Sequence, residues 1–188
     1  MPDTFIRIGV FNFAPSPAMN LRAAILLEHS KTQSLKIAAW IGGDAGRFAG
    51  LIALFLTDEY RVVQRAAWIV SIIAEKHPEL IQPHIGVMVR RMQMAGLPSA
   101  VKRNVLRILQ NIPLPEALHG EVMSACFDFL ADPREPIAIR AFSMSVLGEL
   151  AKQYPDIKSE LKLVIEDGLE QEPSAGYKAR ARKVLGKL

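Results

Sequence analysis

A repeated pattern of apolar residues constrains the fold of this chain more than any other feature of its sequence. The pattern has apolar residues at offsets 0, 4, 7, 8 and 11, which share one face of an α-helix because the helix turns once in ~3.6 residues. It starts at Val62, Val101, Ile139 and Tyr177, so successive starts are 39, 38 and 38 residues apart. Of its twenty positions, nineteen are apolar or aromatic, and the exception is Ser143. Four such stripes at one spacing indicate a repeated structural unit.

Proline followed by an acidic residue marks three boundaries between helices, at Pro78-Glu79, Pro115-Glu116 and Pro155-Asp156. Proline suits the first turn of a helix because its missing N–H is not needed there, and an acid suits the positive end of the helix dipole. A second helix is therefore expected between stripes. The expected ranges are Asp44–Leu56, Glu79–Met94, Glu116–Ala131 and Asp156–Leu169. One helix pair cannot bury both of its apolar faces, so the units must stack.

The repeat resembles the HEAT/armadillo class of α-solenoids over about 144 residues, from Ala45 to Leu188. The resemblance is carried by Pro136-Ile137-Ala138-Ile139-Arg140 and Val146-Leu147-Gly148-Glu149-Leu150, and Val184-Leu185-Gly186-Lys187-Leu188 repeats the second motif. It implies an all-α fold, a right-handed α-solenoid of about four stacked helix pairs. HEAT motifs specify an architecture and not an activity.

The chain is expected to form a single domain over residues 1–188, with an N-terminal arm and cap in 1–43 and HEAT-like repeats in 44–188. Asn20 could cap a helix Leu21–Glu28, and Ser30 could cap another that ends near Ile41. These two helices would cover the open apolar end of the first unit. Thr4–Phe13 would form an arm, either packed on the body, or exchanged with another copy or disordered.

Composition excludes several classes of protein. The single cysteine, Cys126, rules out an intramolecular disulfide framework. The longest stretch without charged residues, Ile8–Leu21, contains two prolines and does not read as a membrane span. With no signal peptide evident, the expectation is a soluble cytoplasmic protein without membrane association. No set of metal ligands, phosphate loop or nucleophile motif is evident, so neither enzymatic activity nor a cofactor is expected.

The modest net charge of +4 conceals a strong pattern along the chain. Residues 61–112 carry a net charge of +6, residues 113–172 carry −7, and residues 173–188 carry +5. The acidic zone between the two basic zones argues against one continuous track for a phosphate backbone.

Helical geometry indicates which side chains face away from the apolar stripe. Offsets 2, 6 and 9 point away from it, at ~100° per residue. In HEAT-like stacks the second helix of each pair lines the concave side, so the resemblance implies that these offsets face a groove. Their occupants are Gln64, Trp68, Ser71, Arg103, Arg107, Gln110, Ala141, Ser145, Gly148, Ala179, Lys183 and Gly186. None is acidic and the third row is small, so the pattern predicts open space beside basic side chains.

Eight residues form the candidate partner-binding set. They are Gln64, Arg65, Trp68, Arg103, Asn104, Arg107, Arg140 and Ser145. A tryptophan beside arginines suits a binding hot spot or a stacking platform. Alternatively, Trp68 could pack under the N-terminal segment or against Arg107. The arginines at 103 and 107 could be solvated charges, and in the HEAT pattern a basic residue at position 140 braces neighbouring units.

The leading functional hypothesis is a scaffold that binds another protein or a peptide with an acidic surface. Nucleic-acid binding through the basic zones is the alternative. HEAT-like alkylpurine DNA glycosylases share this architecture and pair an aspartate with aromatic side chains near the lesion, but the groove rows here contain no acid, and Glu75 at a helix end is the nearest. A third possibility is homo-association through the arm and the ends of the solenoid.

Overall fold

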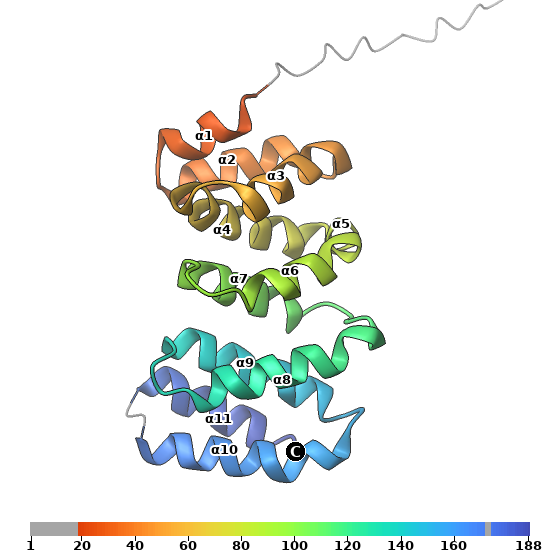
Figure 1. Ribbon diagram of the computed structural model, residues 1–188, viewed down its shortest axis with the longest axis vertical. Coiled ribbons are helices and arrows are strands. Elements are labelled where there is room, and N and C mark those ends of the chain that lie inside the picture. Colours follow the sequence, from red (N-terminus) through yellow and green to blue (C-terminus); the bar gives the residue numbers. More distant parts are fainter. Residues whose placement is uncertain (1–18, 172–173) are drawn as a thin grey trace, which may run out of the picture.

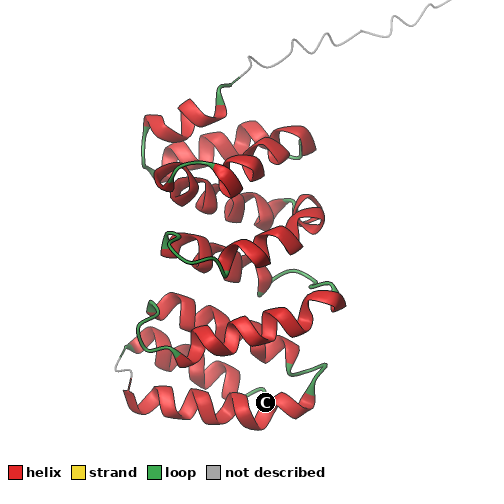
Figure 2. Ribbon diagram, viewed as in Figure 1, coloured by secondary structure: helices red, strands yellow, loops and turns green. Residues whose placement is uncertain are grey.

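The computed structural model describes residues 19–171 and 174–188, and within these ranges every regular element is helical (Figures 1 and 2). The all-α fold expected from the repeat is thus confirmed. The proposed arm at Thr4–Phe13 lies outside the described residues.

Successive helices form pairs that stack along the long axis of the molecule (Figure 1). We call the first helix of each pair A and the second B. The A helices are α1 (Leu21–Leu27), α3 (Ala45–Thr57), α6 (Ile85–Met92), α8 (His119–Ala131) and α10 (Lys158–Gln171). The B helices are α2 (Lys31–Ile41), α4 (Tyr60–Lys76), α7 (Ser99–Leu109), α9 (Ile137–Leu150) and α11 (Ala175–Leu185). Short 3₁₀ turns, Glu116–Leu118 and Pro155–Ile157, lead into α8 and α10.

Side-chain caps fix several helix starts. Asn20 and Ser30 each accept a hydrogen bond from the backbone three residues on, and so do Asp44 and Ser174. The expected helix Glu79–Met94 is instead divided into α5 (Pro78–Ile81), a 3₁₀ turn Gln82–His84, and α6. Pro83 lies in that turn and has no N–H with which to continue an α-helix.

The repeated stripes form the core of the stack. All twenty positions are buried except Ile112, Leu185 and Leu188, which are half-buried. Each B helix packs on the next one, and these contacts are more extensive than those between successive A helices. The B helices therefore form the more extensively packed layer of the stack.

The N-terminal cap is itself a helix pair. Helix α2 packs on α4 in the way that the later B helices pack on each other. The same five offsets are occupied by Ser30, Ser34, Ile37, Ala38 and Ile41. Two serines and a shorter spacing of 32 residues to Val62 hide this stripe in the sequence.

Arg65 attaches the first pair to the second. Its Nη1 donates to the carbonyls of Ile25 and Leu26, each at 3.0 Å. These carbonyls belong to the last turn of α1, where the helix itself supplies no N–H partner. Arg65 of α4 therefore supplies hydrogen-bond donors that the C-terminal end of α1 lacks.

Arg140 and Tyr177 connect the last two pairs. Arg140 is buried, donates from Nε to the Leu130 carbonyl at 3.1 Å, and places its guanidinium carbon 4.8 Å from the centre of the Tyr177 ring. Tyr177 lies directly over Gly168 of α10, where a Cβ would be only 2.1 Å from the tyrosine Oη. Helices α10 and α11 can pack in this way only because residue 168 has no side chain.

Replacing Gly168 with alanine should lower the free energy of unfolding by about 2–3 kcal/mol, because the added methyl group overlaps the Tyr177 hydroxyl. Gly120→Ala is the matched control, since a Cβ there would meet no atom within 4 Å. In that exposed helical position alanine should raise stability by up to about 1 kcal/mol. Urea unfolding followed by circular dichroism measures both, and equal stability of the two variants would contradict the packing described.

Arg65→Met should loosen α1 without affecting the C-terminal pairs, because it removes a charged donor worth about 1.5–3 kcal/mol from two helix-end carbonyls. Hydrogen exchange should become faster by about tenfold or more in residues 21–27 and stay unchanged in residues 137–150. Arg61→Met, one turn earlier on α4 at an exposed position, is the control. Unchanged protection of α1 in Arg65→Met would disprove this role.

Candidate functional site

The exposed face of the B helices carries two adjacent hollows. The α4–α7 hollow has a volume of about 360 Å³, and the α7–α11 hollow has a volume of about 170 Å³. Asn111 lines both of them. Six of the twelve positions expected to face the groove line these hollows. They are Ser71, Arg107, Gln110, Ser145, Gly148 and Lys183. Helical geometry therefore located this face, which is our candidate functional site.

The α4–α7 hollow contains an ion pair. Arg107 donates from Nη2 to Oε1 of Glu75, and both side chains are partly exposed to solvent. The acid lies one turn beyond Ser71, the last position of the groove rows on α4, and the helix continues to Lys76. The groove thus holds an acidic side chain that the three rows considered in the sequence did not include. Its charge is compensated by Arg107.

Trp68 and Gln64 lie on α4 and are half-buried. Neither residue lines one of the two hollows. The indole is not sealed in the core, but it is not widely exposed either. Arg65, which was expected to flank it in the groove, turns instead toward the end of α1.

Two members of the candidate set are inaccessible to a partner. Asn104 is 3% exposed and donates to the Ala100 carbonyl at 2.8 Å within its own helix. Arg140 is also 3% exposed, in the contact with Tyr177 described above. The two residues lie at offsets 3 and 1, which border the apolar stripe and point between helices. Their assignment as partner-binding residues was wrong for that reason.

Arg103 is the exposed basic residue of the candidate set. It lies on α7 and makes no ion pair with the described residues. Its neighbour Lys102 is engaged by Glu135 instead. Arg103 therefore presents an uncompensated positive charge on the B-helix face.

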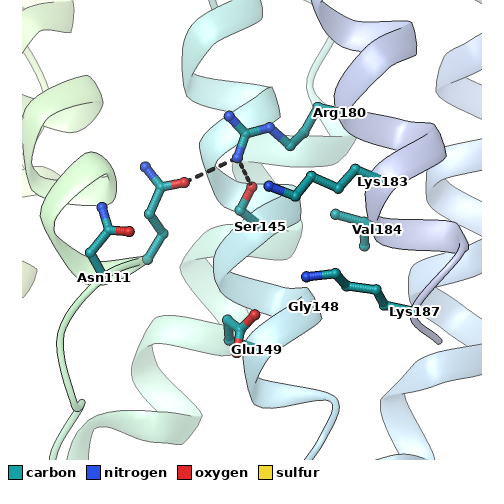
Figure 3. Close-up of a pocket in the computed structure, with 9 residues that line it drawn as sticks. Asn111, Ser145, Gly148, Glu149, Arg180, Lys183, Val184 and Lys187 are labelled. Carbon is teal, nitrogen blue, oxygen red and sulfur yellow. Dashed lines mark hydrogen bonds between the residues drawn. The ribbon is translucent and has the colours of Figure 1, made fainter.

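The α7–α11 hollow is built around Arg180, which the sequence did not indicate. Its Nη1 donates to Oε1 of Gln110 at 3.1 Å and to Oγ of Ser145 at 2.6 Å, so one side chain of α11 reaches both α9 and α7 (Figure 3). Lys183 of α11 and Lys187, just after the end of that helix, extend over the same hollow (Figure 3). Arg180 lies at offset 3, outside the rows assigned to the groove. Its guanidinium reaches the hollow because the arginine side chain is long.

Charges are separated between the two layers of helices. Most acids of the zone 113–172 belong to the A side, on α8 and α10 and the turns before them. They are Glu116, Glu121, Asp128, Asp156, Glu160, Glu166, Asp167 and Glu170. On the B helix α11 every charged residue is basic. The acidic zone separates the basic zones in sequence, but on the B helix α9 it contributes only one acid, Glu149.

Cys126 and His119, two buried side chains that can react in other proteins, have structural surroundings here. Burial raises the pKa of the Cys126 thiol to about 12, which leaves it protonated and unreactive near neutral pH. His119 is buried, with Nε2 2.9 Å from the Leu114 carbonyl and Nδ1 2.9 Å from the Tyr154 hydroxyl. Because a carbonyl only accepts, Nε2 carries the hydrogen and donates it.

Residues 19–171 and 174–188 contain neither a cluster of metal-binding side chains nor a helix that could span a bilayer. No group of three or more His, Cys, Asp or Glu side chains there could hold a metal ion. No helix in these ranges combines the length and apolar character needed to cross a bilayer.

Comparison with known proteins supports the repeat architecture. A family model described as a HEAT repeat domain matches residues 21–188, and so includes the α1–α2 pair. Searches of curated proteins and of solved structures gave no match. The match covers nearly all of the chain, and the same residues form stacked helix pairs. The chain therefore belongs to the HEAT repeat family.

Proposed function

We propose that this protein is a non-enzymatic scaffold that binds another protein or a peptide along the exposed face of its B helices. One observation carries the proposal: this face combines two hollows with basic side chains that have no acidic partner among the described residues. Those side chains are Arg103, Arg180, Lys183 and Lys187.

The expected partner surface is acidic. Opposite charge raises the rate of encounter and disfavours wrong partners. The acids of α8 and α10 lie on the A helices, so they would repel an acidic partner from that side. The separation of charge between the layers thus favours approach to the B-helix face.

Arg103→Glu and Trp68→Ala should each weaken partner capture by about tenfold. The first variant reverses an exposed charge, and the second removes a large, half-buried aromatic side chain of that face. The immobilised full chain and each variant are incubated with extract of cells that encode it. Captured proteins are then quantified by mass spectrometry and confirmed by cross-linking to α4 or α7.

Arg90→Glu is the matched control, because it makes the same charge reversal at an exposed position of the A helix α6. Its capture should equal that of the parent chain. Circular dichroism and thermal unfolding show whether each variant keeps its fold. Capture of the same proteins in equal amounts by the parent and both groove variants would refute the proposal.

Nucleic-acid binding is the second candidate, favoured by the placement of most acids of the zone 113–172 on the A side. Gel shifts with single- and double-stranded DNA and RNA at two salt concentrations separate the two candidates. Binding that falls steeply with salt and is lost in Arg103→Glu would favour nucleic acid.

A further inference from the structure

Arg180 holds a positive charge in the α7–α11 hollow without a carboxylate to compensate it. The hydrogen bonds of its Nη1 go to an amide oxygen and a hydroxyl, both neutral. Its guanidinium carbon also lies 5.8 Å from the centre of the Phe142 ring, so the position of the group is defined on one face. A guanidinium has five N–H groups, and Nε and Nη2 donate to no acceptor within the described ranges.

Two lysines add to this charge. Lys183 lies one turn after Arg180 on α11, and Lys187 lies in the turn that follows the helix; both line the hollow with Arg180. Both lysines are exposed and make no ion pair in the described part of the chain. The acid that lines the hollow, Glu149, is paired with Lys152 in the turn that follows α9. The hollow therefore has a clear excess of positive charge.

The floor of the hollow is open because it is formed by a glycine. Gly148 packs so closely on α11 that a Cβ there would lie 3.1 Å from Cγ1 of Val184. The Lys187 side chain lies over this bare stretch of α9 (Figure 3). A volume of about 170 Å³ corresponds to several water molecules at ~30 Å³ each, enough for one small anionic group.

A single anionic group fits this arrangement better than a nucleic-acid backbone. The α9 row beside the hollow, Ala141 and Ser145, is uncharged, and Glu75 with its partner Arg107 leaves the neighbouring α4–α7 hollow without net charge. Phosphates spaced along a strand would meet unpaired cations of this face only at Arg103 and around the α7–α11 hollow. A side-chain group on a peptide needs only the one hollow.

We propose that the α7–α11 hollow binds an oxyanion carried by the side chains of a partner peptide, either a phosphoserine or a pair of adjacent carboxylates. Arg180, Lys183 and Lys187 supply the charge, and Ser145 supplies a hydroxyl next to it. This inference rests on the proposed scaffold function and names the chemistry that one part of its surface recognises.

The test is a titration of the ¹⁵N-labelled full chain, followed by NMR at constant ionic strength. The probes are inorganic phosphate, a phosphoserine peptide with glycine flanks, the same peptide with Glu-Glu in place of phosphoserine, and its unmodified serine form. Phosphate and at least one anionic peptide should shift the Arg180 Nε–H and the amides of Ser145 and Gly148 in a saturable way. The tighter of the two anionic peptides identifies the source of the oxyanion, and the serine peptide should have no effect.

Lys183→Gln/Lys187→Gln should weaken phosphate binding by about tenfold or more, because charge-assisted hydrogen bonds are lost. Both side chains are exposed and unpaired, so the fold should be unaffected. Lys178→Gln/Arg182→Gln makes the same change in charge on the same helix outside the hollow and should leave binding within about twofold of the parent.

Three results would overturn the inference. The first is no saturable shift at these groups, and the second is equal weakening of phosphate binding in both double variants. The third is stronger binding of a ten-residue thymidine oligonucleotide than of either anionic peptide, with shifts from Arg103 to Lys187. The last result would assign this face to nucleic acid. Partner capture that depends on Arg103 and Trp68 while the titration fails would overturn the oxyanion site alone. If anions bind the hollow as expected but partner capture is the same in the parent, Arg103→Glu and Trp68→Ala, the result would count against the scaffold proposal instead.

Discussion

Packing of each B helix on the next is the interaction on which the rest of the structure depends. The buried stripe of each B helix faces its own A helix and the adjacent B helices, so no pair completes its core alone. The same packing determines which side chains remain outside. Once offsets 0, 4, 7, 8 and 11 are buried, offsets 2, 6 and 9 lie on the opposite side of each B helix, where ten of the twelve side chains keep some exposure and Ser71 and Ala141 are buried. The candidate functional face is therefore a geometric consequence of the core.

Where helices begin and end could be predicted from local chemistry, and so could the residues they bury. Proline with a following acid marked the starts near Pro78, Pro115 and Pro155, and the stripes identified the buried positions correctly. The sequence analysis missed the α1–α2 pair as a repeat, because Ser30 and Ser34 replace apolar residues in its stripe. Periodicity of hydrophobic residues cannot detect a unit whose buried face is partly polar.

The candidate site was harder to predict than the fold, because long side chains act beyond the helix that carries them. The offset of a residue gives the direction of its Cβ but not the place where a guanidinium ends. Arg65 leaves its helix to cap α1, Arg140 turns inward to Tyr177, and Arg180 reaches across α9 to Gln110. Each destination depends on the positions of neighbouring units, which follow from tertiary packing alone.

In the α7–α11 hollow, the residues that pack the helices together also form the proposed oxyanion site. Gly148 lets α9 and α11 approach closely, and the absence of its side chain leaves the hollow open. Arg180 braces three helices through neutral acceptors, which bind a guanidinium more weakly than an anion does. An incoming oxyanion can therefore gain stronger hydrogen bonds from the free Nε and Nη2 without first breaking an ion pair. A carboxylate of the chain in place of Ser145 would brace the units more firmly, but it would neutralise the charge on which the proposed oxyanion site depends.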